Sequence, residues 1–177
     1  AVAANGSGAG ATEDNQYRYT SPTMGGFTVQ IGGAFKAYSG ATGTVGDSQQ
    51  FRASYANGPI TAIVSKERNN LGNEGTDFGA SYDLGVAKIN LISGKVESAA
   101  GATVADAMTL SATVPMGALT LKAAMKNDKV AANNDVTALG VDYALSKRTV
   151  VELNTWKIKN DTANAKNAVW AGVRHAF

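Results

Sequence analysis

The chain has 177 residues, of which 44% are hydrophobic and only 17% charged, with 20 glycines, 3 prolines and no cysteine. This length and hydrophobic content suit one folded domain, and the absence of cysteine excludes a disulfide framework and a thiolate metal site. The formal net charge of +2 comes without any run of basic residues, which argues against binding to nucleic acid through its phosphates.

The first segment, residues 1–13 (AVAANGSGAGATE), is rich in alanine and glycine. It lacks the basic start and the long apolar centre of a secretory signal, so we predict a flexible segment. Apolar runs such as ITAIV (residues 60–64) are far shorter than the roughly 18 to 20 residues that a membrane-spanning helix needs. No transmembrane helix is predicted.

Alternation with a period of two dominates the chain after this segment. Phe27, Val29 and Ile31 share one parity, and polar residues occupy the positions between them. The pattern returns at 51–55, 78–82 and 119–125, and no segment shows a sustained helical period. Segments such as 27–38, 118–127 and 149–159 reach about ten residues, the length at which a tilted strand crosses hydrocarbon. The pattern predicts strands with one apolar and one polar face.

The predicted connections alternate in length along the chain. Short connections rich in turn-forming residues lie at 21–26, 56–58, 83–85, 115–117 and 145–148. Longer polar connections lie at 39–48, 68–75, 96–104, 126–135 and 159–167. This regularity, about one hairpin every 30 residues, predicts an antiparallel up-and-down meander of about eleven strands.

Alternation by itself is compatible with a soluble β-sandwich or with a transmembrane β-barrel. Aromatic residues near the short turns favour the barrel, because tyrosine rings suit the interface between lipid and water. We predict that they form a membrane girdle made of Tyr19, Phe27, Tyr55, Tyr82, Tyr143 and Phe177. A general preference of aromatic residues for strands is the competing explanation.

Three segments in consistent order resemble the general porins of betaproteobacterial outer membranes: QYRYTSPTMGGFTVQIGGAF (16–35), YALSKRTVVELNTW (143–156) and GVRHAF (172–177). The resemblance implies an all-β, antiparallel up-and-down transmembrane barrel of sixteen strands, of which this chain holds the last eleven. It makes residues 1–13 the tail of the constriction loop and 14–177 the later strands of a single barrel domain. An open sheet of eleven strands would expose two edges, so we expect a partial chain.

The same resemblance implies partners and a location. We expect a homotrimer in the outer membrane of a Gram-negative bacterium, in contact with membrane lipid and lipopolysaccharide. The carboxy-terminal strand resembles the signal that the barrel-assembly machinery reads, which in this chain comprises Val169, Ala171, Val173, His175 and Phe177.

The polar parity of the predicted strands holds the candidate pore-lining residues: Arg18, Lys36, Arg52, Lys88, Lys122, Lys126, Asp142, Glu152 and Arg174. With Asp77 added, basic residues outnumber acidic ones by seven to three. We therefore predict a water-filled channel for passive diffusion of small hydrophilic solutes and ions, with a weak anion preference. The resemblance implies a basic cluster near the constriction, for which Arg18 and Arg52 are the best candidates.

Other functions receive less support. An outer-membrane barrel that acts as an adhesin or anchor stays open, although loops poor in aromatic residues offer few anchors for a partner. A soluble β-sandwich binding module is a further alternative. The only histidine, His175, has no partner motif for nucleophilic catalysis, so we predict neither an enzyme nor a cofactor or metal.

Overall fold

A computed structural model describes residues 15–35, 38–39, 43–44, 47–130, 135–160 and 163–177. The segment 1–13 and Lys36, for which the sequence analysis made predictions, lie outside the described residues. Within the described part of the chain, no helix is long and apolar enough to cross a membrane.

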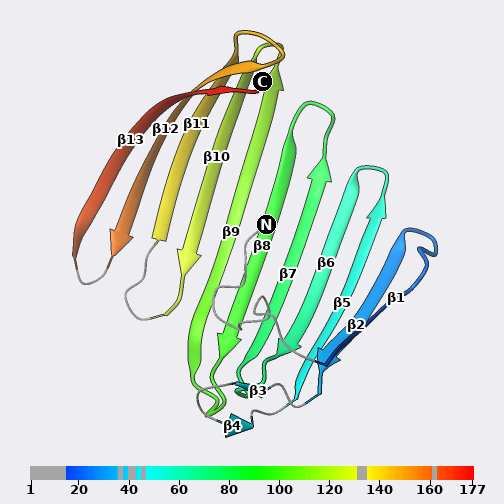
Figure 1. Cartoon of the computed structure of the whole chain (residues 1–177). Helices are drawn as coiled ribbons and strands as arrows, with labels where there is room; N and C mark the ends of the chain where they lie inside the picture. Colours follow the sequence, from blue (N-terminus) through cyan, green and yellow to red (C-terminus); the bar gives the residue numbers. More distant parts are fainter. Residues whose placement is uncertain (1–14, 36–37, 40–42, 45–46, 131–134, 161–162) are drawn as a thin grey trace. The chain divides into compact units, whose positions relative to one another are not determined.

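The fold is one antiparallel sheet of eleven strands, hydrogen-bonded in chain order apart from a small hairpin (Figure 1). Its strands are β1 (Gln16–Thr20), β2 (Phe27–Ala34), β5 (Ser48–Asn57), β6 (Ile60–Arg68), β7 (Glu74–Asp83), β8 (Lys88–Glu97), β9 (Thr103–Met116), β10 (Leu119–Asp128), β11 (Asp135–Ala144), β12 (Thr149–Asn160) and β13 (Ala163–His175). The hairpin pairs β3 (Tyr38–Ser39) with β4 (Gly43–Thr44). The predicted all-β meander of eleven strands is confirmed.

The chain divides into two compact units, residues 1–80 with 92–106 and residues 81–91 with 107–177. In the first unit the register separates the two faces. Phe27 pairs with Tyr55 and Ile31 with Phe51, while Gln30 pairs with Arg52. Residues directly opposite each other project from the same face, so one face is apolar and the other polar.

In the second unit the same separation runs across β9 to β13. Leu119 pairs with Met116 on one side and with Tyr143 on the other, and Tyr143 pairs with Val151. Asp142 pairs with Glu152 on the opposite parity. We call the two surfaces of each unit the apolar face and the polar face.

The apolar face is solvent-exposed in the isolated chain. Among the described residues the only buried apolar side chains are Ala34 and Val96, whereas many large apolar side chains are exposed. Every exposed large apolar side chain that lies within a strand projects from the apolar face, with the single exception of Trp170. A sandwich needs two sheets that bury a core between them, and the described strands form one long sheet without such a core. The soluble sandwich alternative is therefore wrong.

The connections are tighter than the sequence analysis expected. Strand β9 continues through Pro115 and Met116, so the expected turn at 115–117 reduces to Gly117 and Ala118. The expected loop 68–75 shortens to 69–73, because Asn69 Oδ1 accepts hydrogen bonds from the backbone N–H groups of Leu71 and Asn73. The polar composition of residues 68–75 suggested a longer loop, but the side chain of Asn69 closes the segment into a compact turn.

Candidate functional site

The candidate site is the polar face, because it holds the charged side chains that the alternation singled out. Eight of the nine predicted pore-lining residues lie on it: Arg18, Arg52, Lys88, Lys122, Lys126, Asp142, Glu152 and Arg174. The ninth, Lys36, lies outside the described residues. The register thus places these side chains on one surface within each unit.

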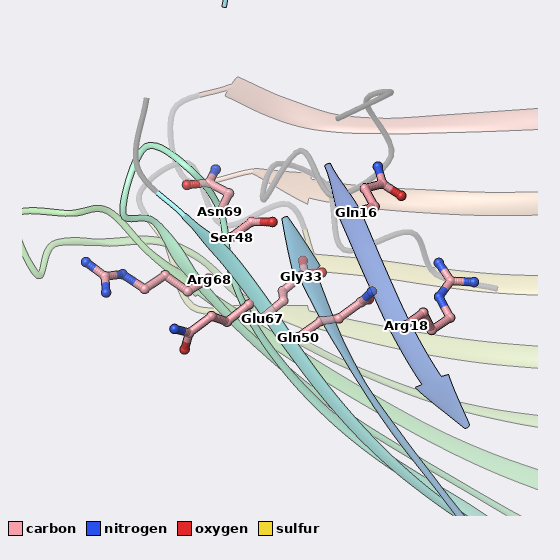
Figure 2. Close-up of a pocket in the computed structure, with 9 residues that line it drawn as sticks. Gln16, Arg18, Gly33, Ser48, Gln50, Glu67, Arg68 and Asn69 are labelled. Carbon is pink, nitrogen blue, oxygen red and sulfur yellow. The ribbon is translucent and has the colours of Figure 1, made fainter. Parts of the chain in front are cut away.

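In the first unit the polar face contains a small pocket of about 40 Å³ (Figure 2). Its polar side chains include Gln16, Arg18, Ser48, Gln50 and Glu67. Figure 2 shows Arg18 and Arg68 pointing away from each other, as expected from residues on opposite faces of the sheet. The pocket has room for water molecules or a small ion but not for a larger solute.

Arg18 and Arg52 are the solvent-exposed cations on the described part of the polar face in this unit. Neither forms an ion pair with any of the residues that the structure describes. A guanidinium keeps its positive charge at every physiological pH. The polar face of the first unit therefore presents two cations whose charge no neighbouring carboxylate cancels.

Acidic side chains also lie on this face of the first unit. Glu67 pairs in register with Gln50, and Ser65 Oγ donates a hydrogen bond to Asp77 Oδ2. Glu67 was not among the predicted pore-lining residues, although the alternation Thr61, Ile63, Ser65, Glu67 predicts the same face. The excess of basic charge is accordingly smaller than the predicted seven to three.

In the second unit, three basic side chains on the polar face meet carboxylates in pairs, whereas Lys88 and Lys166 form no ion pair with any described residue. Lys122 Nζ contacts Asp142 Oδ1 in an ion pair that lacks hydrogen-bond geometry. Arg174 Nη2 lies 3.1 Å from Glu152 Oε1. The carboxylate side chains are mostly covered, with 19% of Asp142 and 16% of Glu152 exposed, so these pairs are screened less than fully exposed ones.

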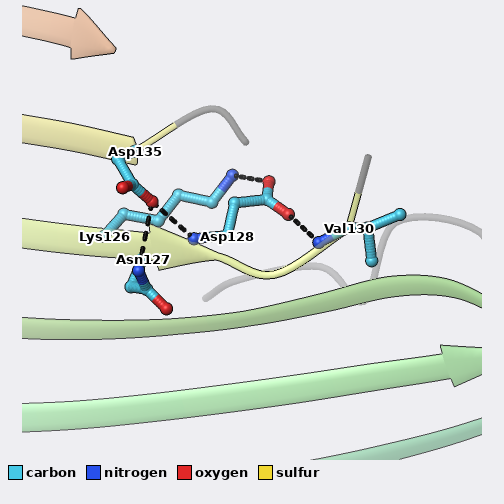
Figure 3. A network of polar contacts seen from close by, with 5 residues as sticks. All are labelled: Lys126, Asn127, Asp128, Val130 and Asp135. Carbon is cyan, nitrogen blue, oxygen red and sulfur yellow. Dashed lines mark hydrogen bonds and ion pairs between the residues drawn. The ribbon is translucent and has the colours of Figure 1, made fainter. Parts of the chain in front are cut away.

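A third pair belongs to a network at the long-loop end of β10 and β11 (Figure 3). Lys126 Nζ lies 2.9 Å from Asp128 Oδ2, and the Val130 N–H donates to Asp128 Oδ1. Asp135 Oδ1 accepts hydrogen bonds from the Asp128 N–H and from Asn127 Nδ2. The network joins the ends of the two strands and neutralises Lys126 locally.

Neither of the two tryptophans of the chain was among the predicted pore-lining residues. Trp156 shares the parity of Glu152 on β12, and Trp170 shares that of Arg174 on β13, so both lie on the polar face. Each tryptophan lies an even number of residues from a predicted pore-lining residue on the same strand. This spacing could have placed both tryptophans on the polar face from the sequence.

The predicted girdle residues Tyr19, Phe27, Tyr55, Tyr82 and Tyr143 lie on the apolar faces, close to the short turns of their units. The rings of Phe27 and Tyr55 are 4.5 Å apart. Phe177 follows the last strand and is fully exposed, with its ring 4.9 Å from that of His175.

The carboxy-terminal strand β13 presents its predicted signal residues on one face. Val169, Ala171, Val173 and His175 share the apolar face through their partners on β12. A hydrogen bond of 2.9 Å joins His175 Nδ1 to Thr149 Oγ1, and the Ala176 N–H donates to the Arg148 carbonyl. His175 therefore has a structural contact at the end of the strand. Among the described residues, no cluster of three or more His, Cys, Asp or Glu side chains could hold a metal ion.

Charged residues also occur on the apolar face, but only towards the long-loop ends of the strands. In the first unit Lys66 pairs with Glu74 at 3.1 Å, and Lys95 pairs with Glu97 at 2.9 Å. In the second unit Lys157 and Lys159 on β12 are exposed on this face. The middle and short-turn ends of the apolar face are free of charged side chains within the described strands.

Comparison with known proteins gives one family. A profile of the family described as Gram-negative porin matches residues 1–163. Among solved structures, the chain is similar to the anion-selective porin from Comamonas acidovorans, with 27% identity and a TM-score of 0.73 over 93% of this chain and 60% of that one. It is also similar to a triple mutant of the Rhodopseudomonas blastica porin, with 21% identity and a TM-score of 0.67 over 96% of this chain and 58% of that one.

The chain thus spans about three fifths of the length of these solved structures. No curated protein matches the sequence.

Proposed function

Because the chain belongs to the Gram-negative porin family, whose members are β-barrel channel proteins of the bacterial outer membrane, we propose that its polar face lines a water-filled pore. The pore would carry small hydrophilic solutes and ions by passive diffusion, without a chemical reaction. The observation behind this proposal is the separation of side chains, with exposed large apolar residues on one face and charged residues on the other. An apolar face towards lipid and a polar face towards water is the arrangement of a transmembrane barrel.

The proposed pore prefers anions weakly. Arg18 and Arg52 supply positive charge that no described ion pair cancels, whereas Lys122, Lys126 and Arg174 are each paired with a carboxylate. The similar porin from Comamonas acidovorans is described as anion-selective, which supports the same sign of selectivity. The preference stays weak because Glu67 and Asp77 share the polar face with the two arginines.

Planar bilayers test both parts of this function separately. The purified protein is reconstituted, its conductance is measured in symmetrical potassium chloride, and the reversal potential is then measured across a salt gradient. We expect stepwise, long-lived conductance and a reversal potential whose sign reports more chloride than potassium permeation. Absence of conductance from correctly folded protein would overturn the channel, while a cation preference would overturn only the selectivity.

The aromatic residues near the short turns form the proposed membrane girdle. In the first unit the rings of Tyr19 and Phe27 are exposed on the apolar face, and the ring of Tyr55 packs against that of Phe27. Tyr82 and Tyr143 take the same positions in the second unit. At the opposite ends of the strands, the exposed Lys157 and Lys159 suit the phosphate groups of lipopolysaccharide. Replacing both lysines by glutamine should reduce co-purified lipopolysaccharide, and unchanged binding would contradict this role.

Assembly is the remaining part of the proposal. We propose a homotrimer, and a carboxy-terminal signal for the barrel-assembly machinery made of Val169, Ala171, Val173, His175 and Phe177. The exposed ring of Phe177 beyond β13 is accessible to such a partner. Deleting Phe177 should lower the yield of heat-modifiable trimer in outer membranes while the protein that does assemble keeps its conductance. A normal trimer yield would count against the signal.

A further inference from the structure

The polar face of the second unit carries an open pocket of about 500 Å³ that the channel function does not explain. Both tryptophans of the chain, Trp156 and Trp170, line it. A diffusion pore needs a wet surface, and an indole ring is apolar over both of its faces apart from one N–H group. Their presence on this face calls for a function.

The pocket follows from two rows of cross-strand pairs. In one row Ala124 pairs with Ala138, which pairs with Trp156. In the neighbouring row Lys122 pairs with Gly140, Gly140 pairs with Asn154, and Asn154 pairs with Trp170. Small residues on β10 and β11 thus leave a depression, and the larger side chains of Lys122 and of β12 and β13 surround it.

The indole ring of Trp170 lies along its own strand and is accessible to solvent. Its six-membered ring occupies the space above Gly172, where a Cβ atom would collide with ring atoms Cη2 and Cζ2. An aromatic ring can cover a glycine for structural reasons alone. Trp170 nevertheless remains 46% exposed and is the one large apolar strand residue exposed on the polar face. A ring that lies along its own strand over a glycine can serve as a stacking platform.

The polar groups around the depression are electrically balanced. The stem of Lys122 and the amide of Asn154 lean over Gly140, where a Cβ atom would lie 3.0 Å from Lys122 Cε. The ammonium group of Lys122 is neutralised by Asp142. Hydrogen-bond donors and acceptors are therefore present beside the indoles without a net charge, and a charged solute gains no ionic contact here.

We propose that this pocket is a low-affinity subsite for the pyranose ring of a neutral sugar that diffuses along the polar face. One face of such a ring is made of C–H groups that stack on an indole, and its hydroxyl groups hydrogen-bond to amide and ammonium groups. The pocket volume of about 500 Å³ falls in the range of small-molecule sites. The subsite rests on the proposed channel function, because the sugar reaches it only from the lumen.

Intrinsic fluorescence provides the test, because both tryptophans of the chain lie in the pocket and no other indole contributes signal. The folded protein in detergent is titrated with D-glucose, and in parallel with the acyclic polyol sorbitol, which has hydroxyl groups but no ring face. We expect a saturable change with glucose in the millimolar range and none with sorbitol. Equal changes with both solutes would overturn the proposal, as would saturable binding of benzoate that glucose does not displace.

Two variants locate the subsite. Trp170→Ala should weaken the glucose response by about fivefold, read out through Trp156. Leu153→Ala, on the apolar face of the neighbouring strand β12, should leave the response unchanged and controls for effects on the sheet. In bilayers, glucose should reduce the ion current of the wild type and of Leu153→Ala more than that of Trp170→Ala. Ion current without a glucose effect would remove the subsite alone, whereas absence of ion current would remove the channel function itself.

Discussion

The polar faces of the two units use their charged residues differently. In the first unit Arg18 and Arg52 remain outside every ion pair among the described residues. In the second unit Lys122 and Arg174 are held by Asp142 and Glu152 in pairs across neighbouring strands. The second unit holds the two tryptophans instead.

The proposed anion preference and the proposed sugar subsite therefore rest on different units. Unpaired arginines act on ions at a distance through their field, which depends on ionic strength. In the proposed subsite, neutralised pairs beside indole rings would act only at contact and would favour uncharged solutes with an apolar face.

The largest effect should come from Gly26, which lies in the turn between β1 and β2 and whose carbonyl accepts a hydrogen bond from the Ala56 N–H on β5. Gly26 has φ of +89°, and a Cβ there would lie 2.6 Å from the Ala56 carbonyl oxygen. Gly58 also has a positive φ, of +53°, but open space around it. We expect Gly26→Ala to lower the free energy of unfolding by about 3 kcal/mol and Gly58→Ala by about 1 kcal/mol. Urea unfolding in lipid vesicles measures both, and equal losses would show that the close approach to Ala56 has no influence.

Charge reversal of the first unit should have the next largest effect. At roughly 7 Å in water one unit charge changes the energy of an ion by about 0.6 kcal/mol, or about threefold in population. With screening by salt, Arg18→Glu with Arg52→Glu should shift the chloride to potassium permeability ratio by about tenfold towards potassium. The reversal potential in a salt gradient measures it. Lys66→Glu, on the apolar face, is the matched control and should leave the ratio unchanged. An equal shift from both variants would contradict the assignment of the two faces.

Freeing one lysine of the second unit should make that unit resemble the first. Asp142→Asn removes the carboxylate that neutralises Lys122. One unit charge favours chloride and disfavours potassium, and with screening by salt the ratio of chloride to potassium permeability should rise by about threefold. Glu97→Gln, which removes the partner of Lys95 on the apolar face, is the control. If Asp142→Asn changes the ratio no more than Glu97→Gln does, the pairs of the second unit have no part in ion selection.

The smallest effect should come from the network at the long-loop end of the second unit. Asp135→Ala removes the acceptor of two hydrogen bonds, from the Asp128 N–H and from Asn127 Nδ2. Because this end of the strands is accessible to water, the free energy of unfolding should fall by only about 1 kcal/mol. Asp135→Asn keeps the acceptor oxygen and should recover most of the loss in the same urea titration. Selectivity should not change, and a shift as large as that of Asp142→Asn would place Asp135 on the ion path.

Much of the fold was predictable because it rests on local patterns. The alternation of Phe27, Val29 and Ile31 predicted the apolar face of β2, and turn-forming residues at 56–58 and 145–148 predicted where hairpins reverse. The errors occurred where a side chain changes the backbone path, as at Asn69, whose carboxamide shortens an expected loop. Composition reports the polarity of such a segment but not its hydrogen bonds.

The sequence by itself determined the strand order, the two faces and the parity of the charged residues, because a period of two is a property of each strand separately. Only the tertiary structure decided which charges meet. Lys122 and Asp142 lie 20 positions apart in the chain, and the register of β10 and β11 brings them into contact. The pocket of Trp156 and Trp170 was decided in the same way, since its small floor lies on β10 and β11 and its rings on β12 and β13. Contacts across strands depend on register and on the reach of side chains, and neither is written in the alternation of a single strand.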